Sequence, residues 1–211
     1  MRRALVSLFA VSTLSLFAQA PAAQVPAAPA APAKAEAPKP GPEMDRLKPF
    51  LGSFRVDEHF SGPGAPSVTG AGFSRVSLGP GGFTLLIDYT TLSGPAHGMK
   101  GHGVLGWDAG ANTYKQAWVD SMAPSIEVTT GTWVGDNLVL NGSGTLNGKA
   151  IQSRTTLSAI TADGFTVTGE VSMDGGPMQK VIELVHHRIG APAAPAPAAA
   201  PAAAAPTPAT K

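Results

Sequence analysis

Five histidines, fourteen carboxylates and a few hydroxyl and arginine side chains are the residues of this sequence that could do chemistry, because cysteine is absent. The absence of cysteine excludes disulfides, thiolate zinc sites, cysteine nucleophiles and iron–sulfur clusters. His97 and His102 lie five residues apart on one expected strand, and His186 and His187 are adjacent. Each pair therefore points to opposite faces of its strand unless a bulge intervenes, and we expect no metal site.

Catalytic motifs are also missing from the sequence. There is no Gly-x-Ser-x-Gly nucleophile elbow, and Gly142-Ser143-Gly144 falls within an expected strand. Hydrolysis by paired carboxylates would need two of them to converge in a cleft. The only candidates for such a pair are Asp120, Glu170 and Glu183. We therefore expect no catalytic residues and a protein that is not an enzyme.

A further set of residues indicates binding rather than catalysis. Period-two alternation places several polar or aromatic side chains on strand faces that should turn toward an apolar interior. These candidate ligand-binding residues are Tyr89, Gln116, Trp118, Asp120 and Arg188. An inward arginine is costly unless it is paired, so we expect Arg188 to meet Asp120, Glu183 or an anionic group of a ligand. The alternative is that the aromatic members of the set only fill the core.

The elements that must position these residues lie between residues 44 and 189, and composition separates this part from the rest of the chain. Outside it lie 13 of the 20 prolines, whereas 23 of the 25 glycines lie inside it. The segment carries ten Lys and Arg residues against twelve Asp and Glu residues, so it lacks the basic character of a nucleic-acid-binding domain. We expect one domain with no nucleic-acid partner.

The sequence pattern predicts an all-β domain. Ten strands are expected, near residues 53–60, 67–77, 83–92, 97–106, 112–120, 125–134, 137–146, 150–159, 164–173 and 178–189. Tight turns such as Asn147-Gly148 join successive strands, which indicates an up-and-down order. Ten strands cannot remain a flat open sheet with two exposed edges, so we predict a closed antiparallel up-and-down β-barrel. One short N-terminal helix, Pro42–Lys48, precedes it and ends at Pro49.

Alternation also assigns faces in the clearest strands. In the third expected strand, Phe83, Leu85, Ile87 and Tyr89 share one face and should point inward. In the ninth, the inward set is Phe165, Val167, Gly169, Val171 and Met173.

The two ends of the chain differ in composition from the domain. Arg2 and Arg3 precede an apolar run and small residues, so residues 1–20 are expected to be a cleaved signal peptide rather than a membrane span. Residues 21–43 and 190–211 are rich in Ala and Pro and are expected to be a disordered linker and tail. We therefore expect a periplasmic or secreted protein.

Three stretches of the domain resemble known families. Phe50-Leu51-Gly52-Ser53-Phe54 is similar to the Gly-x-Trp entry of lipocalins and fatty-acid-binding proteins, with Phe54 in place of the tryptophan that closes the barrel floor. The block from Gly101 to Met122, GHGVLGWDAGANTYKQAWVDSM, and the closing strand from Val181 to Arg188 resemble a bacterial family known only as domain of unknown function 1579. The resemblance covers most of residues 44–189. It implies a calycin-like barrel and no established activity.

The resemblance also implies two kinds of ligand. In fatty-acid-binding proteins, Arg and Tyr of late strands hold the lipid carboxylate, which implies that role for Arg188 with Arg154 and Tyr89. The related nitrobindins bind haem through one histidine, which implies His102 or one of His186 and His187 as an alternative, although we expect no cofactor. Our leading hypothesis is a cavity that binds a small hydrophobic or amphipathic molecule. The other alternative is an envelope-associated structural or interaction module whose barrel is filled.

Overall fold

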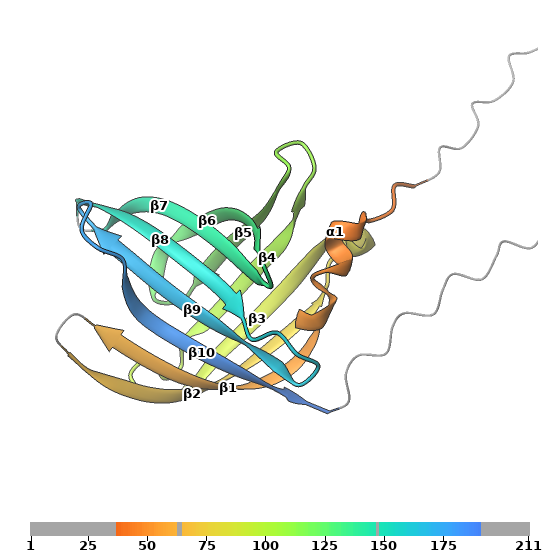
Figure 1. Cartoon of the computed structure of the whole chain (residues 1–211). Helices are drawn as coiled ribbons and strands as arrows, with labels where there is room; N and C mark the ends of the chain where they lie inside the picture. The colour runs from red at the N-terminus through yellow and green to blue at the C-terminus, as the bar shows by residue number, and fades with distance from the viewer. Residues whose placement is uncertain (1–36, 63–64, 147, 191–211) are drawn as a thin grey trace, which may run out of the picture. The chain divides into compact units, whose positions relative to one another are not determined.

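The computed structural model describes residues 37–62, 65–146 and 148–190. The expected signal peptide, most of the expected linker and nearly all of the expected tail lie outside these residues. The predicted closed antiparallel barrel is confirmed, since each strand pairs with its predecessor and the last pairs with the first (Figure 1). The strands are β1 (Gly52–Gly62), β2 (Ala65–Leu78), β3 (Thr84–Ser93), β4 (Lys100–Asp108), β5 (Thr113–Asp120), β6 (Ala123–Val134), β7 (Asn137–Leu146), β8 (Lys149–Ser158), β9 (Gly164–Met173) and β10 (Gln179–Ile189).

The N-terminal segment closes one end of the barrel, which we call the floor. It consists of α1 (Pro42–Asp45) and the 3₁₀ helix η1 (Lys48–Phe50), so the α-helix is shorter than the expected Pro42–Lys48. Leu47 and Phe50 are buried, and the Phe50 ring packs edge-on against Phe165 at 4.9 Å between centroids. The hydroxyl of Tyr114 donates a 2.9 Å hydrogen bond to the Glu43 carbonyl. These contacts leave the opposite end, the mouth, as the way into the barrel.

Two expected strand starts are wrong. Phe83 follows the 3₁₀ helix η2 (Pro80–Gly82) and is 38% exposed instead of pointing inward, because β3 begins only at Thr84. His97 lies in a turn, where its amide bonds the Gly94 carbonyl, because β4 begins at Lys100. His97 and His102 therefore do not share a strand.

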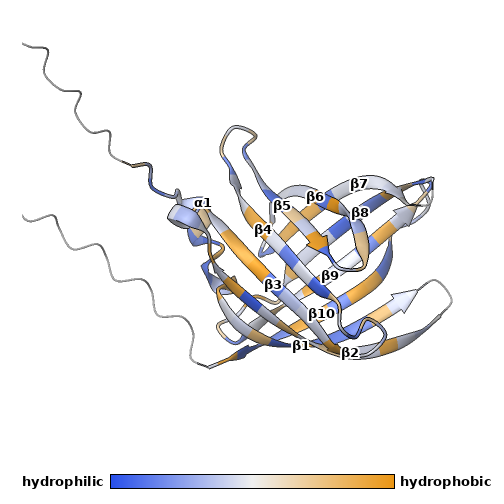
Figure 2. Ribbon diagram, turned by 180° about the vertical axis from the view of Figure 1, so that it is seen from behind, coloured by the Kyte–Doolittle hydropathy of each residue, from blue (hydrophilic) through white to orange (hydrophobic). Residues whose placement is uncertain are grey.

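Alternation of hydrophobic and hydrophilic residues along the strands is visible in Figure 2. Burial also alternates on β1 and β3, with Phe54, Val56 and Glu58 buried on β1 and Leu85 and Tyr89 buried on β3, and Glu58 is the hydrophilic exception in this set. The barrel core is therefore built from one face of each strand. Within the described part of the chain, no helix has the length and apolar character needed to cross a membrane.

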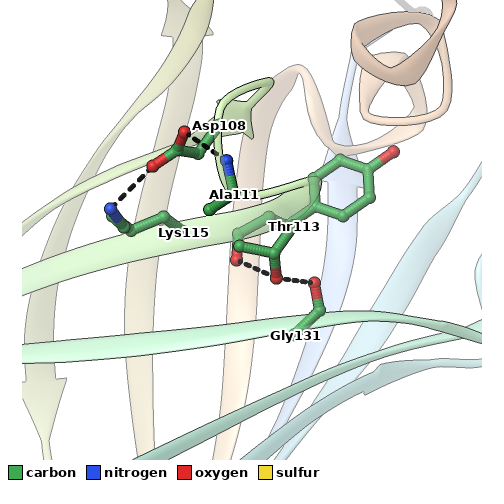
Figure 3. A network of polar contacts seen from close by, with 6 residues as sticks. Asp108, Ala111, Thr113, Lys115 and Gly131 are labelled. Atoms are coloured by element: carbon green, nitrogen blue, oxygen red, sulfur yellow. Dashed lines mark hydrogen bonds and ion pairs between the residues drawn. The ribbon is translucent and has the colours of Figure 1, made fainter.

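The turn between β4 and β5 fixes the start of the strand that carries most of the candidate site (Figure 3). Asp108 accepts a 3.1 Å hydrogen bond from the Ala111 amide, and its other oxygen lies 2.8 Å from Lys115 Nζ. The hydrogen bond from Lys115, together with those from the turn amides, holds the pKa of Asp108 below its usual range. Thr113 donates a 2.8 Å hydrogen bond to the Gly131 carbonyl and so ties the turn to β6.

Candidate functional site

Two adjoining cavities occupy the barrel interior, so the barrel is not filled. The cavity nearer the floor has a volume of about 100 Å³, and the one nearer the mouth has about 280 Å³. Their walls have six residues in common: Tyr89, Gln116, Trp118, Thr155, Val167 and Leu184. A molecule entering from the mouth would pass these shared residues to reach the inner space.

The inner cavity is almost entirely apolar. Leu85, Leu105 and Phe165 line it together with His186, which is the only titratable side chain apart from Tyr89 among the described residues of its wall. The His186 ring stacks on Phe165 at 4.2 Å between centroids, and burial lowers its pKa to about 4. This imidazole is therefore neutral near pH 7, and the inner cavity carries no charge.

The outer cavity contains a buried carboxylate. Glu58, on β1, is 1% exposed and lines this cavity. Its Oε1 accepts a 2.6 Å hydrogen bond from the Tyr89 hydroxyl and a 2.9 Å hydrogen bond from the Thr91 hydroxyl. Burial, followed by the hydrogen bond to Glu58 and the charge of Glu58, raises the pKa of Tyr89 well above its usual value. No group among the described residues donates to the other oxygen, Oε2, which is also buried.

Glycines on two strands make room for the side chains of the site. A Cβ at Gly72 on β2 would lie 2.7 Å from Glu58 Oε1. A Cβ at Gly103 on β4 would lie 2.9 Å from the Trp118 ring, and one at Gly101 would overlap that ring. The Trp118 indole therefore rests directly on the backbone of β4.

Trp118 is oriented by its neighbour on β5. Its indole nitrogen donates a 3.1 Å hydrogen bond to Asp120 Oδ2. The other oxygen of Asp120 accepts hydrogen bonds from the amides of Met122 and Ala123, at 2.8 and 3.0 Å. Asp120 thus joins the turn at the mouth to the aromatic wall of the cavity.

The structure brings four of the six sequence-predicted site residues together. Tyr89, Gln116, Trp118 and Asp120 all line the outer cavity. Whether they contact a ligand stays a prediction.

Arg188 and His102 lie elsewhere, which corrects their expected positions. Arg188 is on the inward register of β10 but at the floor, where its guanidinium donates to the carbonyls of Pro49, Leu51 and Ala162 and covers the Phe54 ring at 4.7 Å. It meets neither Asp120 nor Glu183, because carbonyls of the N-terminal segment and of the loop between β8 and β9 supply its acceptors. His102 is on the outer face, 2.8 Å from Asp88.

Arg154, implied as a partner of Arg188 by the resemblance, also lies away from the two cavities. It is 3.6 Å from Glu170 on the neighbouring strand β9, and its side chain is 41% exposed. No Lys or Arg is among the described residues that line the two cavities.

Sequence reasoning missed Glu58 and Thr91. The sequence did indicate that Glu58 faces inward, since Glu58 shares the period-two spacing of Phe54, Val56 and Phe60 on one strand. Carboxylates are almost never fully buried without partners, and those partners come from β3, which only the fold places nearby.

Metal and haem sites find little support in these residues. No group of three or more potential metal ligands occurs among the described side chains. His186 is the one histidine among the described residues that line the two cavities. The space beside it, about 100 Å³, is well below the roughly 300–1,000 Å³ typical of pockets for drug-sized ligands. A porphyrin does not fit there as the side chains stand.

Comparison with known proteins agrees with this architecture. A family model described as "Protein of unknown function (DUF1579)" matches residues 39–188. The chain is similar to the crystal structure of Rv2717c from M. tuberculosis, with a TM-score of 0.50 and 18% identity over 72% of this chain and 100% of that chain. It is also similar to the S-type phycobiliprotein lyase CPES from Guillardia theta, with a TM-score of 0.47 and 13% identity over 70% and 91% of the two chains. No curated protein matched. At 18% identity the likeness to Rv2717c shows a similar fold alone.

Proposed function

The chain belongs to the DUF1579 family of proteins of unknown function, and we propose that it binds a small hydrophobic or amphipathic molecule inside its barrel. The observation that carries this proposal is the pair of adjoining cavities that share Tyr89, Trp118 and Leu184. Apolar walls favour transfer of apolar surface from water by about 25 cal/mol per Å², and the few polar groups near the mouth orient the ligand. We propose binding without chemical conversion of the ligand.

The alternatives are less well supported. A filled barrel would leave no continuous space beside Trp118, whereas the outer cavity there has a volume of about 280 Å³. A haem protein would need a histidine beside a larger space than the one at His186.

Titration with N-phenyl-1-naphthylamine, a neutral probe that fluoresces in apolar surroundings, tests the proposal. We expect saturable binding to the full-length protein that weakens about tenfold or more in Thr155→Trp, because the added indole fills the space between the two cavities. Val119→Ala is the matched control, because Val119 lies on β5 beside Trp118 but is 39% exposed on the other face. Probe binding that is absent, or equal in all three proteins, would overturn the proposal.

We also propose that the protein is exported. Support comes from Arg2, Arg3 and the apolar run that follows them. The mass of the mature protein recovered from the periplasm or medium of an expressing bacterium should correspond to loss of about the first 20 residues. A full-length mass in the cytoplasm alone would contradict export.

A further inference from the structure

We propose that the ligand is an organic cation, an amphipathic amine whose ammonium group is held by Glu58 while its apolar part lies against Trp118 and in the inner cavity. This inference rests on the proposed function and adds the sign of the ligand's charge. It differs from the fatty-acid carboxylate that the sequence resemblance implied.

The wall of the outer cavity is acidic. The titratable residues that line the outer cavity, Tyr89 aside, are Glu58, Asp120 and Glu127, which are all acidic. The one imidazole of the inner cavity is His186, which is neutral near pH 7 because burial lowers its pKa to about 4. An anionic ligand would therefore meet carboxylates without a compensating cation in the cavity wall.

Arg188, which lies on the inward register of β10, does not add a positive charge to the cavity wall. All three donating nitrogens of Arg188 are engaged by the carbonyls of Pro49, Leu51 and Ala162 at the floor. Those bonds would have to break before the guanidinium could reach a ligand.

Glu58 itself has an incomplete set of hydrogen-bond donors. Its side chain is 1% exposed, and Oε1 already accepts two hydroxyl hydrogen bonds. No described group donates to Oε2, so half of a buried carboxylate lacks a hydrogen-bond donor. A buried carboxylate is costly unless it is paired, and an ammonium group offers both the opposite charge and the missing donors.

The partners of the other two carboxylates favour an organic cation over a metal ion. The oxygens of Asp120 bond Trp118 and the turn amides, and Glu127 accepts a 2.9 Å hydrogen bond from Ser153. These carboxylates form no group of three ligands with Glu58, and none is found elsewhere among the described residues. One carboxylate beside an aromatic ring and apolar walls suits an alkylammonium ion better than Mg²⁺ or Ca²⁺, which prefer six or more oxygens.

Three probes with the same eight-carbon chain test the inference by calorimetry on the full-length protein: octylamine, octanol and octanoate. We expect octylamine to bind about tenfold or more tightly than octanoate, with octanol between them, because a charge-assisted hydrogen bond is about twice as strong as a neutral one. In Glu58→Gln, the affinity for octylamine should fall about tenfold, while that for octanol should change little. Glu183→Gln is the control, because Glu183 pairs with Lys180 outside the cavities.

The outcomes separate the two proposals. Binding of none of the three probes would overturn the proposed function. Octanoate binding as tightly as octylamine would overturn the cation inference and leave the binding function in place. An amine preference that is unchanged in a folded Glu58→Gln protein would overturn the assignment to Glu58, and the wild-type comparison decides the charge question even if that variant fails to fold.

Discussion

The Tyr89 hydroxyl on β3 bonds Glu58 Oε1 on β1 at 2.6 Å, although β2 lies between the two strands. The contact is possible because Gly72 occupies β2 at this level. A Cβ there would come 2.5 Å from the Tyr89 hydroxyl and 2.7 Å from the carboxylate oxygen. The hydrogen bond between Tyr89 and Glu58 therefore depends on glycine, which has no side chain, at position 72.

Removal of the Tyr89 hydroxyl should destabilise the protein. In Tyr89→Phe, the buried carboxylate of Glu58 loses a donor, and we expect a loss of about 1–3 kcal/mol in the free energy of unfolding, measured with urea. Tyr114→Phe is the control, because its hydroxyl bonds a neutral carbonyl and its loss should cost only about 0.5–1.5 kcal/mol. Equal losses in the two variants would show that Glu58 does not need the Tyr89 donor.

Stability should fall in mild acid because of His186. Its pKa is lowered from 6.5 to about 4 in the folded protein, so the unfolded chain binds the proton first. The stability linked to this group is complete above pH 6.5 and decreases by roughly 3 kcal/mol as the pH falls to about 4. In His186→Leu, this part of the pH dependence of urea unfolding should vanish. It should persist in His97→Gln, whose histidine is exposed in a turn, and a slope unaffected by His186→Leu would refute the assignment.

Addition of a methyl group at Gly101 should displace Trp118. The new Cβ would overlap the indole ring, so Gly101→Ala should lower the free energy of unfolding by about 1–3 kcal/mol and shift the tryptophan emission. At Gly144 a Cβ would lie 3.8 Å from Ile151 in ordinary contact, so Gly144→Ala should change stability by no more than about 0.5 kcal/mol. Similar effects at both positions would contradict the close packing of Trp118 on β4.

Arg188 should act on stability and not on ligand affinity. Arg188→Ala removes the hydrogen bonds that tie β10 to the carbonyls at the floor, and we expect a loss of about 2 kcal/mol or more. Arg154→Ala is the control, because the partly exposed pair of Arg154 with Glu170, 3.6 Å apart, should be worth no more than about 1 kcal/mol. The folded Arg188→Ala protein should bind N-phenyl-1-naphthylamine as the wild type does. A weakened affinity at unchanged stability would restore the sequence-based assignment of Arg188 to the ligand site.

Predictions from the sequence were best where a strand alternates cleanly. On β5, the spacing of Gln116, Trp118 and Asp120 placed all three on one face, and all three line the outer cavity. The predictions were weakest at strand ends. Phe83 and His97 were assigned to strands although Phe83 lies in a bend before β3 and His97 lies in a turn before β4, because the local sequence does not mark the residue at which pairing begins. Met173, which was expected to face inward, is 47% exposed at the end of β9.

Tight turns and period-two alternation are local properties of the chain, so the sequence alone predicted the number of strands, their order and, for most strands, the side chains that face inward. Which of these inward residues contact one another depends on the three-dimensional structure. Barrel closure puts Glu58 of β1 within reach of Tyr89 and Thr91 of β3. Arg188 is held at the floor because the N-terminal segment offers it a carbonyl acceptor. The charge of the cavity is thus a property of the closed barrel, because it depends on which side chains from separate strands share one enclosed space.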